Sequence, residues 1–329
     1  MVHIGREFDS RKEGEPRPTL FVLGASGLTG RSFANAARRE DIEVIVPSHQ
    51  EFDIAEMRVS RMLSFLQRYR PSVVVNFAAK TNVDECEKER GNKEGKVWQT
   101  NVSGPQRLAL SCLALDIPLV HISTDYVLAG LKENCPHKED EPAAPVDGFY
   151  CQTKAEAEQR VTAPGGKVHI VRIQLPFTHE QDMKLDFPRL VVQRLSRGET
   201  FAVVTDQLIT PGYAEDYAHA ILRIADSEDY GIWHVASPTV VTPFEFAQMV
   251  VNSVEKYGLS FDHSLIKEIT FDEFSATRPA PRPQYNAFDI PNGRYVGSFG
   301  LRDLRSLPIM LLDWAGKFVP QFRTNNAKF

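Results

Sequence analysis

The feature that most constrains this chain is a glycine-rich turn between a strand-like run and a helix-like run. Thr19–Leu23 is apolar, and Gly24-Ala25-Ser26-Gly27-Leu28-Thr29-Gly30 follows it directly, ahead of a helical pattern from about Gly30 to Arg39. Glycines permit a tight turn, and the N terminus of the helix offers free N–H groups and a positive dipole to a pyrophosphate. The spacing is GxxGxxG rather than GxGxxG, but its place between strand and helix satisfies the structural requirement of such a site. The turn therefore predicts a dinucleotide site that includes Gly24, Ser26, Gly27, Leu28, Thr29 and Gly30.

Strand-like and helix-like segments alternate through the first half of the chain. Further strands are expected at 42–46, 73–77, 119–123 and 168–173, and helices at 55–69, 104–114 and 150–162. This alternation of nearly continuous apolar strands with amphipathic helices predicts an α/β fold, a doubly wound parallel Rossmann sheet covered on both faces. We assign residues 19–174 to this NAD(P)-binding domain and residues 1–18 to a polar N-terminal extension.

The pattern changes after about Gln174. Prolines become frequent, strands such as 201–204 and 232–235 stand alone, and helices such as 243–257 lie between long connections. Residues 175–329 are therefore expected to form a smaller mixed α/β substrate-binding domain, with some strands and helices crossing between the two domains. The Pro-rich stretch from Arg278 to Pro283 is incompatible with a helix and predicts an extended loop.

Composition narrows the class of protein. Hydrophobic residues make up 42% of the chain and charged residues 25%, which is typical of a globular protein, and the net charge of −5 gives no electrostatic reason to expect nucleic acid. There is no apolar stretch of about 18 residues and no signal-peptide pattern, so neither a membrane span nor export is expected. The four cysteines show no metal-ligand spacing. We expect a cytoplasmic enzyme without a metal.

Tyr150 and Lys154 form a candidate catalytic pair. Residues four apart on a helix share one face, and a neighbouring ammonium favours the phenolate of a tyrosine whose ordinary pKa is about 10. The YxxxK pattern is weak by itself, but Ser123-Thr124-Asp125-Tyr126 lies at the carboxyl end of an expected strand, where ligands bind in such sheets. Together with the glycine turn, these residues favour a site that reduces a carbonyl.

The choice of dinucleotide depends on the end of the second strand. Val46-Pro47-Ser48-His49 supplies no carboxylate there to repel a 2′-phosphate, and Arg31 follows the glycine turn. These residues favour NADP(H), with NAD(H) as the alternative. Asp53, followed by Ile54, is a candidate for binding adenine; an N-cap of a helix beginning at Ala55 is an equally good interpretation.

Three other features have simpler interpretations. Lys80 lies where cofactor and substrate should meet, although a loop lysine is usually only solvated. His121, within an apolar strand, is expected to be a core histidine with its hydrogen bonds satisfied. The acidic run of Asp84, Glu85, Glu87 and Glu89 is expected to be a solvated helix face.

Several segments together resemble one family, the dTDP-4-dehydrorhamnose reductases of the extended short-chain dehydrogenase/reductases. The glycine turn matches the family motif, and residues 76–84, 101–104 and 122–127 are similar to its N-A-A-A-x-T-x-V-D, N-x-x-G and I-S-T-D-Y-V segments. Residues 139–154 resemble E-D-x-P-x-P…Y-G-x-[ST]-K, and residues 282–289 resemble R-P-x-x-S-x-L-D; residues 206–216 follow D-Q-x-G-x-P-T…D-L-A loosely. The resemblance covers about Thr19 to Asp289.

The resemblance implies NAD(P)H-dependent reduction of the 4-keto group of a nucleotide-activated 4-keto-6-deoxy sugar. Thr124, Tyr150 and Lys154 match the catalytic trio, with Tyr150 as proton donor, Lys154 lowering its pKa and Thr124 orienting the carbonyl. The cofactor would also contact Asp53, Ile54, Ala78, Ala79, Thr81, Tyr150 and Lys154. The nucleotide-diphosphate sugar would contact Thr124, Asp125, Tyr126 and Arg282, the last beside its phosphates.

The departures from the family pattern lie on the substrate side. Residues 172–177 read Arg-Ile-Gln-Leu-Pro-Phe where the family has R-T-S-W-V-Y, so Leu175 replaces an aromatic residue. Cys151 replaces a glycine and Asn286 a serine. A nucleotide-sugar epimerase or dehydratase of the same superfamily, with Asp125 as the acidic residue, and a non-catalytic cofactor-binding regulatory subunit remain alternatives. The exact sugar is not determined, and a homodimer stays open.

Overall fold

A six-stranded parallel sheet forms the centre of the protein in a computed structural model that describes residues 18–296, 299–300 and 304–326. The expected extension of residues 1–18 lies outside these residues except for Pro18. The first half of the chain comprises β1 (Thr19–Leu23), α1 (Leu28–Arg39), β2 (Glu43–Ile45), α2 (Val59–Tyr69), β3 (Val73–Asn76), α3 (Val83–Glu87), α4 (Lys96–Trp98), a π-helix (Gln99–Ser103), α5 (Gly104–Ala114), β4 (Leu119–Thr124), α6 (Phe149–Thr162) and β5 (Val168–Ile173).

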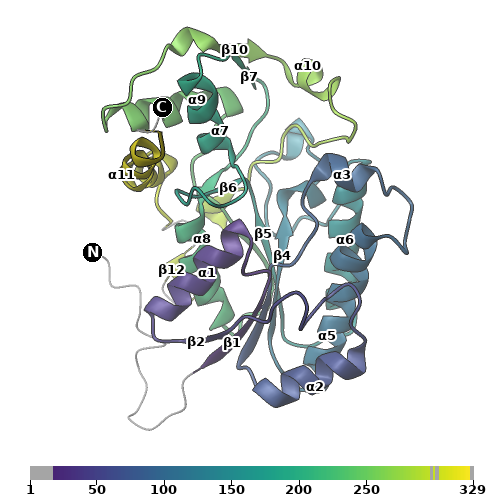
Figure 1. Cartoon of the computed structure of the whole chain (residues 1–329). Helices are drawn as coiled ribbons and strands as arrows, with labels where there is room; N and C mark the ends of the chain where they lie inside the picture. The colour runs from purple at the N-terminus through teal and green to yellow at the C-terminus, as the bar shows by residue number, and fades with distance from the viewer. Residues whose placement is uncertain (1–17, 297–298, 301–303, 327–329) are drawn as a thin grey trace.

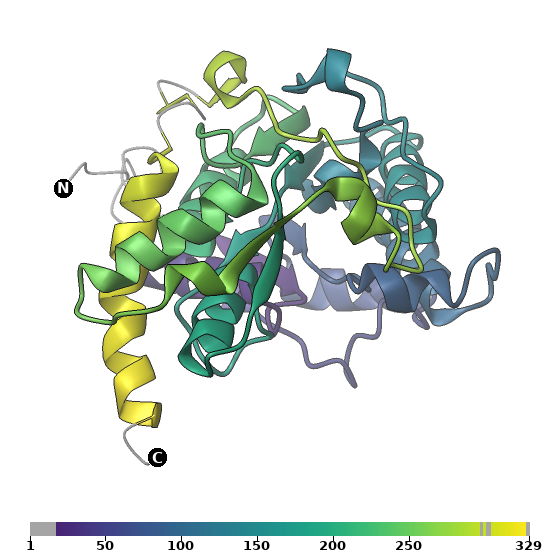
Figure 2. The same ribbon diagram turned by 90° about the horizontal axis from the view of Figure 1, so that it is seen from above.

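The second half of the chain contributes further, mostly short elements. They are β6 (Pro176–Phe177), α7 (Phe187–Ser196), β7 (Phe201–Val204), β8 (Gly212–Tyr213), α8 (Ala214–Ala225), β9 (Gly231–Val235), α9 (Pro243–Glu255), β10 (Ile266–Ile269), α10 (Phe271–Ser275), β11 (Tyr295–Val296), β12 (Phe299–Gly300) and α11 (Leu307–Asn326). Seen from above, α9 and α11 lie next to each other at one side of the molecule (Figure 2).

The strand order is β2-β1-β3-β4-β5-β9, and every neighbouring pair is parallel. The doubly wound parallel sheet predicted from sequence is confirmed. After β2 the chain crosses to the other side of β1, which makes the carboxyl ends of β1 and β3 the switch point where such sheets bind ligands. The sixth strand comes from residues 231–235, an element of the second half that crosses into the central sheet.

Alternation along the strands explains the two layers of helices. Leu20 and Val22 point to one side and pack in a core that includes residues of α1 and α8, whereas Phe21 and Leu23 pack in a second core with residues of α2 and α5. Figure 1 shows α1 and α8 on one face of the sheet and α2, α5 and α6 on the other. Both faces of the sheet are therefore buried under helices, as the apolar strand sequences predict.

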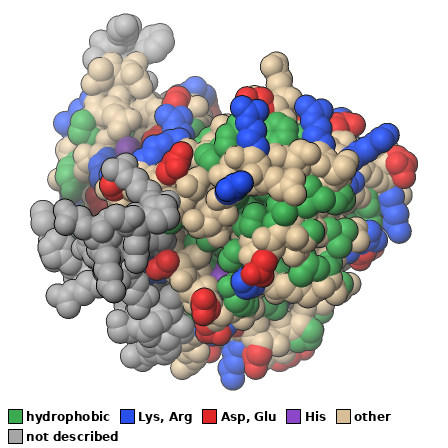
Figure 3. All heavy atoms as spheres, turned by 90° about the horizontal axis from the view of Figure 1, so that it is seen from below, with side chains coloured by type: hydrophobic (Ala, Val, Ile, Leu, Met, Phe, Trp, Pro, Cys, Tyr) green, Lys and Arg blue, Asp and Glu red, His purple; other side chains and the backbone are tan. Residues whose placement is uncertain are grey.

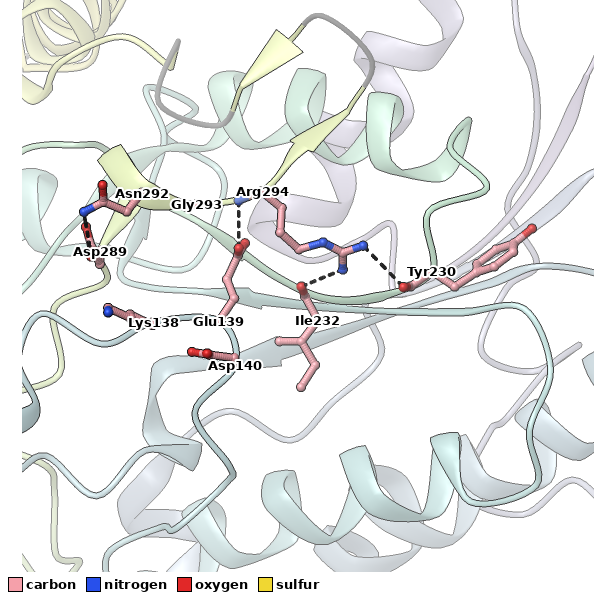
Figure 4. A pocket seen from close by; sticks show the side chains of 9 residues that line it. All are labelled: Lys138, Glu139, Asp140, Tyr230, Ile232, Asp289, Asn292, Gly293 and Arg294. Atoms are coloured by element: carbon pink, nitrogen blue, oxygen red, sulfur yellow. Dashed lines mark hydrogen bonds between the residues drawn. The ribbon is translucent and has the colours of Figure 1, made fainter.

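Among the described residues, side chains rather than another strand cover the outer edge of β9. Glu139 accepts hydrogen bonds from the backbone N–H of His234 (2.7 Å) and of Arg294 (2.8 Å), and Arg294 donates to the carbonyl of Ile232 (3.0 Å). These contacts line a cavity of about 490 Å³ beside the strand (Figure 4). Because the polar groups of the edge have partners, pairing with a further strand is disfavoured.

The end of the sheet opposite the glycine turn is visible in Figure 3. Hydrophobic side chains there lie among lysine, arginine, aspartate and glutamate, and both signs of charge occur among the described residues of this face. In the part of the chain that the structure describes, no helix has the length and apolar character needed to cross a bilayer.

Candidate active site

The glycine turn lies in the crevice between β1 and β3. Gly24 has φ +75°, and a Cβ there would lie 2.6 Å from the backbone nitrogen of Ala78; a Cβ on Gly30 would strike the carbonyl oxygen of Gly24. Helix α1 begins at Leu28, after an N-cap, Gly27, that makes no side-chain capping bond. Its first N–H groups therefore remain available for an anion. The backbone forms a cradle that fits a pyrophosphate, and Ser26 and Gly27 are exposed at its rim.

The carboxyl end of β3 forms the other wall of this crevice. Ala78 and Ala79 are partly exposed and Thr81 is exposed. Asn101, fully buried, accepts from the backbone N–H of Lys80 (2.7 Å) and donates to its carbonyl (3.1 Å) and to the hydroxyl of Thr153 on α6 (3.2 Å). In the sequence Asn101 is only part of a motif, but in the structure it joins this wall of the crevice to the helix that carries Tyr150 and Lys154.

The loop of Asp53 and Ile54 differs from one sequence interpretation. Helix α2 begins at Val59, not at Ala55, so Asp53 is not its N-cap. Residues 54–56 form a turn instead, in which the Asp53 carboxylate accepts from the N–H of Ala55 (2.9 Å). Arg107 on α5 holds the loop by donating to the carbonyls of Ile54 (3.0 Å) and Ala55 (2.7 Å).

Arg31 and Ser48, from which the preference for NADP(H) was predicted, interact with acidic side chains of the protein. Arg31 forms ion pairs with Glu180 (2.9 Å) and Asp182 (2.7 Å). Glu51, which follows the second strand, accepts from both the N–H and the hydroxyl of Ser48 (2.8 Å each). A carboxylate thus folds back to the strand end that the sequence indicated to be free of one, because the chain turns sharply between residues 48 and 51.

The structure brings Thr124, Tyr126 and Tyr150 together at the carboxyl end of β4. The rings of Tyr126 and Tyr150 meet edge to face, with centroids 5.9 Å apart. Burial and the charge of Asp125 raise the pKa of Tyr150, while a hydrogen bond with the Thr124 side chain acts in the opposite direction. The pKa of Tyr150 is thus raised, not lowered as the spacing to Lys154 predicted, and Tyr150 is a neutral phenol at neutral pH, able to donate a proton.

Lys154 lies one turn further along α6 and is 2% exposed. Its Nζ donates to the carbonyl of Ile122 (2.8 Å) and lies 3.5 Å from Nε2 of His121. Burial lowers the pKa of Lys154 to about 8, and the charge of Glu158 opposes this shift. The lysine can therefore gain or lose a proton close to neutrality, which the YxxxK spacing alone did not indicate.

Asp125 is buried, and both of its carboxylate oxygens accept hydrogen bonds from other residues of the protein. Thr124 donates to Oδ1 (2.8 Å), and Gln174 (2.7 Å) and Asn286 both donate to Oδ2. Burial raises the pKa of Asp125 to about 7. Gln174 and Asn286 lie where the family pattern has serines, and sequence reasoning did not pair them. Two departures from the pattern therefore converge on one carboxylate.

The neighbouring Leu175 occupies the place of the family's aromatic residue. Its backbone has φ +36° and its side chain is 43% exposed. The departure noted in the sequence therefore changes a surface beside the site rather than the buried network.

The acidic run after β3 is not a simple solvated face. Asp84 pairs with Arg282 (2.9 Å), and Glu87 accepts from the backbone N–H of Phe149 (2.9 Å), the first residue of α6. Glu89 accepts from the N–H of Val97 (2.9 Å). The solvated-face interpretation holds for Glu85, which is exposed, but is wrong for these three residues because other segments supply their partners. Arg282, expected beside phosphates, is held by Asp84 at the edge of the site.

Other clusters do not add a site. Among the residues that the structure describes, no three His, Cys, Asp or Glu side chains gather as a metal site would require. The cavity beside β9 is lined by residues 138–140, 230, 232, 289 and 292–294, a set that contains no predicted site residue.

The fold and the site define the class of protein. A doubly wound parallel sheet with a glycine cradle at its switch point, and a Tyr–Lys pair on the helix after β4, is the arrangement of a Rossmann-type dehydrogenase/reductase.

Comparisons with known proteins narrow this class. A family model described as the RmlD substrate binding domain matches residues 18–308. A dTDP-4-dehydrorhamnose reductase of Mycolicibacterium smegmatis is 31% identical over 289 residues, covering 87% of this chain and 82% of that protein. A probable low-salt glycan biosynthesis reductase, Agl14, of Haloferax volcanii is 30% identical over 282 residues, or 83% and 90% of the two chains.

Comparison with solved structures gives the same family. A dTDP-4-dehydrorhamnose reductase of Clostridium acetobutylicum superposes with a TM-score of 0.77 at 26% identity, over 92% of this chain and 99% of that one. The chain belongs to the RmlD family of dTDP-4-dehydrorhamnose reductases within the extended short-chain dehydrogenase/reductases, as its sequence motifs predicted.

Proposed function

We propose that this protein reduces the 4-keto group of a nucleotide-activated 4-keto-6-deoxy sugar, with NADPH or NADH as the reductant. The glycine cradle and the β3 wall would hold the dinucleotide, which supplies the hydride. Tyr150 donates the proton to the carbonyl oxygen, and Thr124 orients that oxygen. Lys154, one turn further along α6, would contact the nicotinamide ribose. The similarity to proteins named dTDP-4-dehydrorhamnose reductase supports this substrate class.

The observation that carries the proposal is the neutral, buried phenol of Tyr150 beside Thr124. A proton donor must keep its proton until the hydride arrives, and burial together with the nearby Asp125 charge raises the pKa of Tyr150 accordingly. Both side chains lie at the carboxyl end of β4, the edge of the sheet that also carries the cradle.

The phosphate end of the substrate is assigned to Arg282. Its side chain is 12% exposed and its charge is balanced by Asp84, which would hold the guanidinium in place for a second anion. Tyr126, whose ring faces Tyr150, would contact the sugar.

The hydrogen bonds that Asp125 accepts from other residues of the protein favour a reductase over a dehydratase. An elimination needs an acid that is free to protonate the leaving hydroxyl. Both oxygens of Asp125 already accept hydrogen bonds, from Thr124 on one side and from Gln174 and Asn286 on the other. A dehydratase or epimerase would turn over without added cofactor, and a purely regulatory subunit would not turn over at all.

The test is NADPH or NADH oxidation with a panel of nucleotide-linked 4-keto-6-deoxy sugars. We expect consumption of reduced cofactor that depends on the sugar and a product with a new hydroxyl at C4. No turnover across the panel would refute the proposal, and product formation without added cofactor would favour the dehydratase or epimerase. Tyr257→Phe, at a 42% exposed tyrosine after α9, is a control that should match the wild type.

A further inference from the structure

A chain of hydrogen-bonding groups links the cofactor wall to Lys154. The backbone N–H of Ala78 donates to Oδ1 of Asn76 (3.1 Å), and Nδ2 of Asn76 lies 3.1 Å from Nδ1 of His121. On the other side of the ring, Nε2 of His121 lies 3.5 Å from Nζ of Lys154. Asn76, His121 and Lys154 are at most 2% exposed, so solvent cannot replace any of these contacts.

The direction of each hydrogen bond follows from the first donor. A backbone N–H can only donate, so the Asn76 oxygen faces Ala78 and the Asn76 amide nitrogen faces His121. An amide NH₂ can only donate, so Nδ1 of His121 must be the acceptor. A neutral imidazole has one hydrogen, and that hydrogen must then lie on Nε2, facing Lys154.

We propose that Asn76 and His121 are positioning residues for Lys154. Asn76 holds His121 as the tautomer with its hydrogen on Nε2, and this hydrogen points toward Nζ. An ammonium has only hydrogens to present, whereas a neutral amine has a lone pair that can accept the Nε2 hydrogen. The ring therefore favours the neutral form of Lys154 until another ligand changes its hydrogen bonds.

The surroundings of Lys154 agree with this arrangement. Burial and the lysine itself keep the pKa of His121 well below its usual range, so the ring stays neutral. The carbonyl of Ile122 accepts one lysine hydrogen in either state. Glu158, on the same helix, favours the ammonium, but its carboxylate is shared with Arg172 (2.8 Å) and Ser123 (2.5 Å). His121 is thus the group on β4 that disfavours the positive charge of Lys154.

The importance of the His121–Lys154 contact for catalysis rests on the proposed function, in which Lys154 takes part. A lysine that is neutral in the free enzyme would take up a proton when ligand oxygens replace the Nε2 hydrogen as its neighbour. The tautomer itself does not depend on the proposed function. A measurement of the His121 tautomer therefore tests this proposal independently of whether the protein reduces a sugar.

The experiment is long-range ¹H–¹⁵N correlation spectroscopy of the full protein labelled with ¹⁵N-histidine. His121→Gln identifies the His121 signals. His169 is an internal reference, because Trp233 donates to its Nδ1 (3.1 Å) and its Nε2 faces the carbonyl of Ser227 (3.0 Å), which fixes the same tautomer without a lysine.

We expect His121 to remain neutral with its hydrogen on Nε2 from about pH 6 to 9, and its Nε2 shift to follow a titration near pH 8. Lys154→Met should abolish that titration and leave His169 unchanged. A hydrogen on Nδ1, an imidazolium at pH 7, or the same titration in Lys154→Met would overturn the proposal.

Asn76→Leu tests the first link without adding a charge. With the amide donor removed, the Nε2–H population of His121 should fall and the titration midpoint should rise by about one unit. An unchanged tautomer and midpoint in this variant would overturn the role of Asn76. The wild-type and Lys154→Met spectra decide the His121–Lys154 contact even if Asn76→Leu does not fold.

Discussion

Replacing Glu158 with Gln should destabilise the protein far more than an ordinary ion-pair change on the same helix. Glu158 receives two hydrogen bonds from Arg172, from Nε at 3.0 Å and from Nη2 at 2.8 Å, and one from Ser123 at 2.5 Å. The side chains of Arg172 and Glu158 are 1% and 6% exposed. The substitution therefore leaves an arginine charge buried without its counter-ion.

The magnitude follows from that burial. Breaking a buried ion pair by removing one partner costs about 3–5 kcal/mol. Gln retains one acceptor for Arg172, so we expect the lower end of this range. For 329 residues the entropy of unfolding is roughly 0.7 kcal/mol/K, so a loss of about 3 kcal/mol should lower Tm by roughly 4 °C.

Glu156→Gln is the matched control. Glu156 lies on the same helix and pairs with Arg160 at 2.6 Å, but both side chains are 35% exposed. Such a pair contributes at most about 1 kcal/mol. Thermal unfolding of the two variants under identical conditions measures the difference. If Glu158→Gln lowers Tm no more than Glu156→Gln does, the reasoning about this buried pair is wrong.

Three further outcomes are expected. Gly24→Ala should abolish dinucleotide binding measured by fluorescence, whereas Gly165→Ala, also at positive φ (+81°) but with no atom within 4 Å, should bind normally; equal binding would contradict the cradle. Glu180→Gln with Asp182→Asn should release Arg31 and raise the NADPH/NADH ratio of kcat/KM several-fold; an unchanged ratio would exclude Arg31 from binding the 2′-phosphate. Burial lowers the pKa of Lys154 to about 8, so the unfolded chain binds more protons between pH 8 and 10.5, and the wild type should gain up to roughly 3 kcal/mol relative to Lys154→Met as pH rises through this window. A parallel pH dependence of the two proteins would contradict that pKa.

The sheet and the glycine cradle could be predicted because their signals are local. Five of the six strands are apolar runs of the first half, and the cradle needs only glycines between a strand and a helix. The start of α2 could not be predicted this way, because the bonds that Arg107 on α5 donates to the carbonyls of Ile54 and Ala55 join segments far apart in the sequence.

The candidate site shows the same division. Thr124, Tyr150 and Lys154 have a recognisable spacing, and the structure brings the first two together. The partners of Asp125 come from positions 174 and 286, and no local pattern links residues 112 positions apart. The Asp84 and Glu87 contacts likewise join α3 to the Pro-rich loop and to α6, and a local charge pattern cannot predict partners at such distances in sequence.

The central claim is that Tyr150 supplies the proton to a sugar carbonyl, and a single-turnover comparison of wild type and Tyr150→Phe tests it most directly. With enzyme in excess, the rate of reduced-cofactor oxidation in the presence of the keto sugar should fall by about 10²–10⁴-fold in Tyr150→Phe. The affinity for the dinucleotide, measured on the same samples, should remain unchanged because the cradle is intact. A Tyr150→Phe protein that reduces the sugar at the wild-type rate would contradict the account.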